Sequence, residues 1–232
     1  MAQAQKAAHH SKNALRGAAP ELRMSELRMP DISTDLRFRM LLGEEAWAHL
    51  PAAVQARFSK RLEPGAVALY RGEVIETRLN RMGWLLAQLL RPMGAPLPHH
   101  RANGGAAVVC VSDDSATGGQ CWSRLYTNLH GLPQVIHSVK AFAGPSGLEE
   151  RVGLGIGMAL DVETSRDGLT FTSAHYFWQA GRVRLRLPGW MTPGQTTVIH
   201  RDLGRGHFAF DLSVRHPLLG ELVHQHAVFQ DQ

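Results

Sequence analysis

From Ala66 onward, apolar and polar side chains alternate along most of the chain, and glycine, proline and aspartate interrupt the alternation at short intervals. Because successive side chains of a strand point to opposite faces, this pattern predicts antiparallel strands joined by tight turns. Closure of such a run of strands removes exposed sheet edges. The chain is therefore predicted to be mainly β, a ten-stranded antiparallel barrel or half-barrel, with a two-sheet sandwich as the alternative. The expected strands lie near residues 66–79, 106–112, 119–127, 132–142, 148–163, 169–179, 182–187, 195–202, 206–215 and 221–230.

Two segments have helical spacing instead. After an N-cap at residue 33 or 34, apolar residues recur at helical intervals up to Leu50, with an interruption near Gly43 and a short turn from Pro51 to Phe58. A second helix, expected at 80–91 after the first strand, is apolar around more than half its circumference. Such a helix is covered on both sides in the core, acts as a lid over a cavity, or contacts a membrane or a partner, and we predict the lid, with burial in the core as the main alternative. This layout is similar to that of the intracellular lipid-binding barrels, but their residue motifs are absent from the sequence.

The chain is predicted to hold one domain behind a short leading segment. Residues 1–33 are rich in alanine, serine, lysine and arginine and have no sustained periodicity, so we expect a disordered or partly helical segment there. Residues 34–232 are expected to form a single helix-prefaced, barrel-like domain. Hydrophobic residues make up 44% of the chain and charged residues 19%, which is typical of a folded globular protein.

Cysteine content and hydropathy predict a cytoplasmic protein. Two cysteines, Cys110 and Cys121, are too few for a disulfide framework, and the turn expected between them sends the thiols to opposite faces. The longest apolar stretch, 82–90, is too short to cross a bilayer, so no transmembrane segment is expected.

The positive charge of the sequence is small and is not clustered. The formal net charge is +5 and the pI about 9.7, which raises nucleic acid as a partner. Residues 1–33 carry five basic and three acidic side chains, so only +3 is left for the remaining 199 residues. Because a nucleic-acid surface needs clustered charge, we predict no nucleic-acid partner.

The expected strand 148–163 carries large apolar side chains on one face and glycine or alanine on the other. A two-residue turn at 166–167 would place Tyr176 and Trp178 across from two of the glycines and cover them. We therefore interpret the glycines as structural, because a nucleotide-binding fingerprint needs a strand-to-helix turn. In the same register His175 lies on the apolar side, as a buried core residue or as a group that contacts a ligand.

The two C-terminal hairpins collect histidines. The final turn pairs Asp211 with His226, and the turn before it sets His200 across from His207. One strand face then carries these polar residues and the other carries phenylalanines. If the phenylalanine face is the core, the histidines face solvent. If the barrel is wide and polar inside, they line it, and Asp211 with His226 forms a pair suited to general-base chemistry. A zinc site at the His-x-His ending at His226 would need converging ligands, and we predict no metal.

Short motifs follow one another in a characteristic order: Leu-Gly-x-x-Ala-Trp-x-x-Leu-Pro at 42–51, Trp-x-Arg at 122–124, Glu-Arg-x-Gly at 150–153, Pro-x-Trp-x-x-Pro at 188–193, Phe-Asp at 210–211 and Pro-Leu-Leu-Gly at 217–220. In this order they resemble an uncharacterised bacterial family, the domain of unknown function DUF4166, over about residues 36–230. The chain departs from it at Gln225-His226-Ala227, where the family has Tyr-x-Gly. Members are often joined to a reductase-like nucleotide-binding domain or a small membrane protein. The resemblance therefore implies an accessory or ligand-handling role and assigns no activity.

The positions that match the family motifs with polar or aromatic residues are Trp122, Arg124, Glu150, Arg151 and Asp211. Arg124 shares a strand face with Trp122, while Glu150 continues the apolar face of its strand. We predict that both faces point inward and that the two charges meet in a partly dry interior. There they form either a structural ion pair or a site that fixes the polar head of a ligand.

Our leading hypothesis is a binding module that holds a small apolar or lipid-like molecule. An enzyme that uses His175, or Asp211 with His226, on a carbonyl or ester substrate is the first alternative. A protein-interaction accessory domain for a reductase-like partner is the second. The sequence does not identify a cofactor or a catalytic residue, so both stay unknown. The candidate ligand-binding residues are Trp122, Arg124, Glu150, Arg151, His175, Asp211 and His226.

Overall fold

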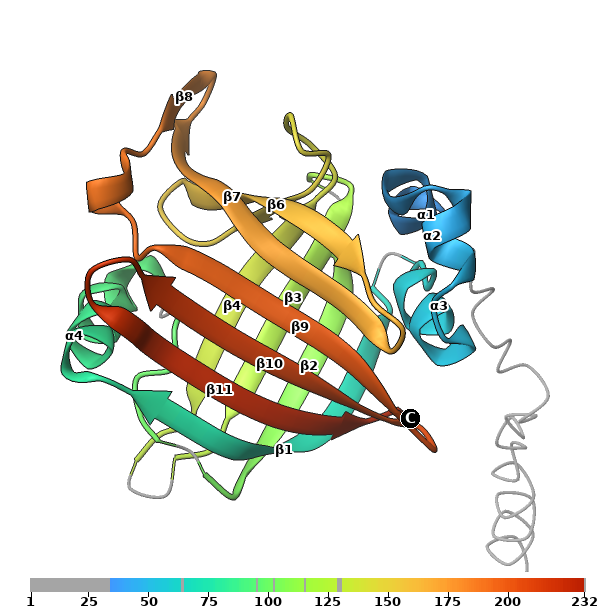
Figure 1. Cartoon of the computed structure of the whole chain (residues 1–232), viewed down its shortest axis with the longest axis horizontal. Helices are drawn as coiled ribbons and strands as arrows, with labels where there is room; N and C mark the ends of the chain where they lie inside the picture. The colour runs from blue at the N-terminus through green and yellow to red at the C-terminus, as the bar shows by residue number, and fades with distance from the viewer. Residues whose placement is uncertain are drawn as a thin grey trace, which may run out of the picture. The chain divides into compact units, whose positions relative to one another are not determined.

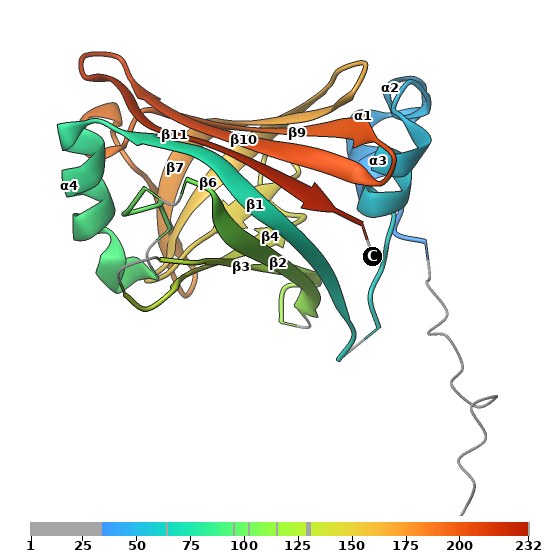
Figure 2. The ribbon, with the colours of Figure 1, turned by 90° about the horizontal axis from the view of Figure 1, so that it is seen from below.

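A closed antiparallel barrel forms the body of the protein, as the computed structural model shows (Figures 1 and 2). Ten strands of the described chain surround the barrel in the order β6-β5-β4-β3-β2-β1-β11-β10-β9-β7, and pairing of β6 with β7 closes it. An additional strand, β8, pairs with β7. The mainly β barrel that the alternation predicted is confirmed. The strands are β1 Val67–Leu79, β2 Gly105–Asp114, β3 Gly119–Tyr126, β4 Gln134–Ala141, β5 Glu149–Arg151, β6 Ile156–Thr164, β7 Gly168–Ala180, β8 Val183–Arg186, β9 Gln195–Gly204, β10 His207–His216 and β11 Gly220–Gln230.

The structure describes residues 34–63, 65–94, 96–101, 103–114, 116–128 and 131–231. The segment 1–33, for which disorder or partial helix was expected, lies outside the described residues. The chain separates after Asp31, and every feature below belongs to the second unit, Ile32–Gln232.

Phenylalanines fill the interior beneath β10 and β11. Phe208, Phe210 and Phe229 are in mutual contact, with ring centroids 5.7–6.0 Å apart. Of the two interpretations of the C-terminal hairpins, the one with the phenylalanine face as core is therefore confirmed. The polar residues that alternate with them point outward.

His200 is an exception, because it faces inward and not with the other histidines. β9 continues to Gly204, and the hairpin turns at Arg205 and Gly206, whose φ angles of 53° and 74° suit a type I′ turn. A register shift beside Phe208 then pairs His200 with Phe210. The predicted pairing of His200 with His207 is wrong, because the turn lies further along the chain and is followed by a bulge.

The expected strand 148–163 is two strands, β5 and β6. A tight turn at 152–155 joins them, closed by a hydrogen bond of 2.9 Å from the amide of Val152 to the carbonyl of Ile156. Leu154 and Gly155 have positive φ angles of 57° and 78° within this turn, a conformation that glycine adopts readily. The glycine-rich stretch therefore folds the chain back on itself where the sequence predicted a curled strand.

The β6–β7 hairpin follows the predicted register only as far as Leu160, which pairs with Ser173. A register shift between Ala159 and Leu160 moves every pair farther from the turn by one residue. His175 therefore lies opposite Ala159. The predicted positions of Tyr176 and Trp178 opposite glycines are therefore wrong. Tyr176 points into the barrel, and His175 points to the outer face.

Three helices, α1 Arg37–Leu42, α2 Glu44–Ala48 and α3 Ala52–Phe58, cover one end of the barrel (Figures 1 and 2). We call this the closed end. Phe38, Val54 and Phe58 are buried there against Leu160 and Phe171 of the barrel. The predicted helical segment and its interruption at Gly43 are confirmed.

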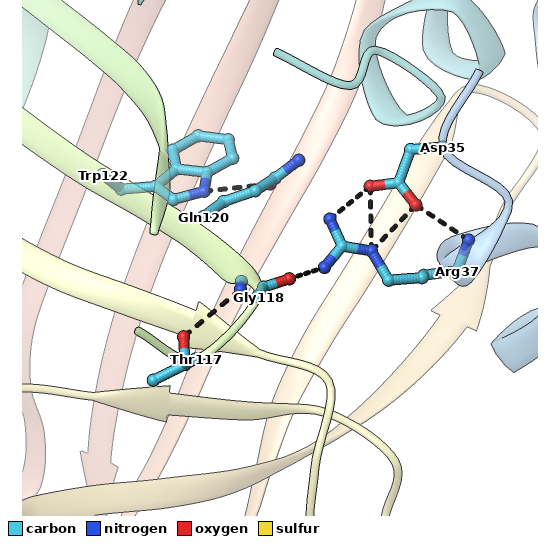
Figure 3. Close-up of polar contacts among 7 residues, drawn as sticks. Asp35, Arg37, Thr117, Gly118, Gln120 and Trp122 are labelled. Atoms are coloured by element: carbon cyan, nitrogen blue, oxygen red, sulfur yellow. Dashed lines mark hydrogen bonds and ion pairs between the residues drawn. The ribbon is translucent and has the colours of Figure 1, made fainter. Parts of the chain in front are cut away.

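Polar contacts hold α1 to the barrel at the closed end. Arg37 pairs with the buried Asp35, with 2.6 Å between Nη2 and Oδ2, and also donates to the carbonyl of Gly118 in the β2–β3 turn (Figure 3). Helix α1 is therefore held to the strands by a hydrogen bond from a charged side chain as well as by apolar packing.

At the opposite end of the barrel lies α4 Arg81–Leu89, followed by the 3₁₀ turn η2 Arg91–Met93. Asn80 caps the helix by accepting from the Gly83 amide at 2.7 Å. A side chain at Gly83 would overlap the backbone of Leu222, so the glycine lets the helix lie directly on β11. Full burial of this helix is wrong, because Trp84 and Leu89 are exposed.

Cys110 and Cys121 lie on the same outer face, because Cys110 pairs with Ser123 and Cys121 with Ser112. The prediction that they face opposite sides is wrong, since the β2–β3 turn is shorter than expected. Both cysteines are free. Within the described ranges, no helix is long and apolar enough to cross a bilayer.

Candidate functional site

The barrel encloses a cavity of about 330 Å³. Its walls come from the inward faces of the strands, and most of them are apolar. Phe58 and Phe171 bound it toward the closed end. Leu86, Leu90 and Met93 border it at the other end, which we call the mouth. Another 3₁₀ turn, η3 Gly189–Met191, also contributes to the rim through Met191.

A group of charged side chains interrupts this apolar wall on β3, β4 and β5. Lys140 and Glu150 are directly opposite each other across two paired strands, with 2.8 Å between Nζ and Oε2. Arg124 approaches the other oxygen of Glu150 at 3.4 Å and donates to the Ser138 hydroxyl at 3.0 Å. We call Arg124, Lys140 and Glu150 the charge cluster. The predicted meeting of Arg124 and Glu150 inside the barrel is confirmed.

Trp122 lies beside both cations of the cluster. Its ring centroid is 5.4 Å from the Lys140 ammonium and 5.6 Å from the Arg124 guanidinium, within the range of cation–π attraction. The indole N–H donates to Gln120 at 3.3 Å, so the ring has a fixed orientation (Figure 3). The ring of Trp122 therefore contacts both cations of the cluster.

The cluster has two cations for one carboxylate. The Lys140 and Glu150 side chains are only 6% and 8% exposed, and Arg124 is 21% exposed. Burial raises the pKa of the Glu150 carboxyl, but the charges of Lys140 and Arg124 and hydrogen bonds from Lys140 and Ser138 outweigh burial and lower it to about 2. Glu150 is therefore ionised at neutral pH.

The pKa of the Lys140 ammonium is also shifted, and here burial is the largest cause. Burial lowers the pKa of its ammonium below 10.5, and although Glu150 raises it, repulsion from Arg124 adds to the lowering. The cluster therefore combines two basic side chains with one carboxylate in the wall of the cavity.

Four of the sequence-predicted site residues are not in the cavity. Arg151 faces outward, where it binds Glu149 at 3.1 Å, and Arg184 of β8 binds the same buried carboxylate at 2.6 Å. His175 lies in a surface groove formed where β7 and β9 diverge. The strand faces that carry these side chains are thus the outer ones.

Asp211 and His226 form the predicted pair, with 2.5 Å between Oδ1 and Nδ1, and Arg201 contacts the other carboxylate oxygen. All three lie on the outer face, and neither Asp211 nor His226 lines the barrel cavity. Among the described residues, no group of three or more His, Cys, Asp and Glu side chains could hold a metal ion.

Sequence reasoning missed Lys140 and Ser138. Both follow the same alternation on β4 as Gln134 and Ile136, which would have placed them on the inward face. The contact to Glu150 could not be foreseen, because it depends on the three-residue strand β5 and on the loop that precedes it.

A family model described as a domain of unknown function (DUF4166) matches residues 50–229. This confirms the resemblance that the motifs indicated, although the match begins later than residue 36 and leaves out most of the motif at 42–51. All three residues of the charge cluster are within the match. No curated protein and no solved structure matches the chain.

Proposed function

The chain belongs to the DUF4166 family of domains of unknown function, and we propose that its barrel binds a small amphiphilic molecule with an apolar body and one negatively charged head. The observation that carries this proposal is an apolar cavity of about 330 Å³ with an excess of positive charge in its wall. Ligand sites in proteins are commonly concave, mostly apolar and about 300–1,000 Å³ in volume.

The shape of the cavity supports a molecule that enters from the mouth. The closed end is sealed by packed aromatic rings, Phe38 against Phe58 at 5.1 Å and Phe58 against Phe171 at 5.9 Å. The mouth is bordered by side chains of α4, η2 and η3, which are short elements outside the barrel sheet. An apolar chain would therefore lie between the mouth and the rings.

The charge cluster supports a carboxylate or similar anion as the head. An anion beside Lys140 and Arg124 would supply the missing negative charge, in surroundings where Coulomb attraction is much stronger than in water. Arg124 is the most exposed of the three and has only a long contact to Glu150, and its planar guanidinium suits a carboxylate with two oxygens. We assign Arg124 and Lys140 to the head and Trp122 to the adjoining wall.

Binding is tested by isothermal titration of delipidated protein with straight-chain fatty acids of increasing length and with the matching alcohols. We expect saturable binding of the acids, at least about tenfold tighter than the alcohols, which corresponds to one charge-assisted contact. Lys140→Met should remove most of that preference and leave alcohol affinity unchanged. Lys60→Met removes the same charge outside the cavity and serves as the control.

Two results would contradict the proposal in different ways. Equal affinity for acids and alcohols would rule out the charged head while leaving the apolar cavity in place. Absence of uptake at any chain length, with no lipid retained by the purified protein in native mass spectrometry, would rule out the binding function itself.

Acid binding should also weaken as pH rises above neutral. An anion next to Lys140 stabilises its protonated form, so the ammonium pKa is higher in the complex than in the free protein, where burial lowers it. Affinity is therefore full while free Lys140 is protonated and falls as pH passes through its lowered pKa. Titrations from pH 7 to pH 10 check this, and the alcohols should show no such fall. A flat profile for the acids would mean that Lys140 does not contact the head.

A further inference from the structure

Exposed apolar side chains gather around the mouth of the barrel. Four segments form this mouth surface: 80–101 apart from residue 95, which includes α4 and η2, the β5–β6 turn at 152–155, the span 180–194 that includes β8 and η3, and the β10–β11 turn at 216–220. In the described part of the chain twenty large apolar side chains are exposed, and eleven of them are in these segments. The concentration at one end is therefore a property of the fold and not of overall composition.

The most exposed of these side chains are at projecting tips. Leu218, 88% exposed, is in the β10–β11 turn, and Trp190, 81% exposed, is in η3. Leu89 of α4 and Leu154 of the β5–β6 turn are exposed on the same end. Figures 1 and 2 show α4 and the β10–β11 turn at the end opposite α1–α3. Apolar exposure on this scale is typical of surfaces that contact a membrane or another protein.

Charge on the mouth surface has a single sign. The four segments contain six arginines and no aspartate or glutamate, which exceeds the net charge of +5 for the whole chain. Arg81, Arg91, Arg101, Arg182 and Arg186 are exposed. Arg184 forms an ion pair with the buried Glu149, and Arg91 donates a hydrogen bond to the neighbouring Gln88 at 3.2 Å. The closed end, in contrast, carries charges of both signs, such as Asp202 in its ion pair with Arg57.

We propose that the mouth surface docks on an anionic membrane. Tryptophan and leucine tips flanked by arginines match the two parts of such a surface, since the apolar tips enter the boundary between head groups and acyl chains while the arginines meet lipid phosphates. A nucleic acid would use the arginines but leave the leucines without a partner. The mouth segments also border the cavity, through Leu86 of α4, Leu90 directly after it and Met191 of η3, so docking places the cavity mouth against the lipid.

Docking is tested by sedimentation of the ligand-free full chain with vesicles of phosphatidylcholine, alone or with one third phosphatidylglycerol, both prepared without fatty acid. We expect binding to the anionic vesicles only, weakening as salt is raised. Trp190→Glu and Leu218→Glu should each lower the partition coefficient at least about tenfold, because each places a like charge in the lipid contact. Both positions are exposed, so thermal melts should show unchanged folding.

Met40→Glu is the matched control, because Met40 is 79% exposed on α1 at the closed end. It should leave vesicle binding unchanged, and an equal loss in this variant would overturn the assignment of the surface. Failure to bind anionic vesicles, or equal binding to both vesicle types, would overturn the proposal. The proposal would also be overturned if duplex DNA or RNA bound the protein more tightly and displaced it from the vesicles, because the arginines would then be assigned to nucleic acid. Since no ligand is present, the result is independent of the amphiphile proposed for the cavity.

Discussion

Replacement of Glu150 by glutamine should lower the free energy of unfolding by about 3–5 kcal/mol, the cost of leaving a buried charge without its partner. The substitution keeps the shape of the side chain but leaves Lys140 and Arg124, two cations, facing each other across a site that is almost fully buried. Lys140→Met should cost less, because Arg124 still compensates Glu150. The charge cluster is thus expected to respond unequally to the loss of its members.

Denaturant melts of single and double variants measure this coupling. Lys140→Met combined with Glu150→Gln should be much less damaging than the sum of the two, because no unpaired charge remains. The cycle of Arg124→Ala and Glu150→Ala should show a smaller coupling, since Arg124 is partly exposed. Glu76→Gln, which breaks an exposed pair with Arg78, is the control and should cost about 1 kcal/mol or less. Additive losses of that size in the cluster would mean that its charges are not buried together.

Acidification from pH 7 to pH 5 should destabilise the protein by about 2 kcal/mol through His200 alone. His200 is 1% exposed and packs between Phe58 and Phe210, with ring centroids 5.1 Å from each. Burial, and then the nearby charge of Arg57, lower the pKa of its imidazole to about 3, while Asp231 has a weaker opposing effect. The native state therefore holds His200 neutral at both pH values.

The sign follows from the depressed pKa. An unfolded chain protonates this histidine below about pH 6.5, and the folded chain does so only near pH 3, so the unfolded state takes up more protons between these values. Stability therefore falls as pH falls through this window. Urea melts at pH 7 and pH 5 should show the loss in the native chain and a much smaller one in His200→Leu. His207→Leu, on the outer face, should behave like the native chain. Identical pH slopes in all three proteins would mean that His200 is protonated in the fold.

Glu150 contributes to acid sensitivity in a lower window. Its folded pKa of about 2 is below its ordinary 4.5, so its contribution is present above pH 4.5 and is lost as pH falls toward 2. The two groups can therefore be separated by pH, with His200 acting first on acidification.

Local pattern determined the strands, the helices and the faces of most strands. Alternation is a property of a single strand, so Trp122 and Arg124 could be assigned to one face without any tertiary knowledge. The pairing of Asp211 with His226 was also predictable, because a short turn fixes the register of a hairpin. The helix expected at 80–91 does begin at this place, where the Asn80 side chain caps the adjacent backbone of α4.

Tertiary packing decided the features on which the proposed site depends. The bulge beside Leu160 turned His175 outward, and the shifted turn after Gly204 turned His200 inward; one extra residue reverses a whole face, and alternation does not reveal it. The charge cluster joins strands across the barrel wall, so Lys140 acquires its partner only when the short strand β5 is in place. The arginines of the mouth surface are dispersed from residue 81 to residue 186 in the sequence, and barrel closure brings them to one end, because closure fixes which ends of distant strands share an edge.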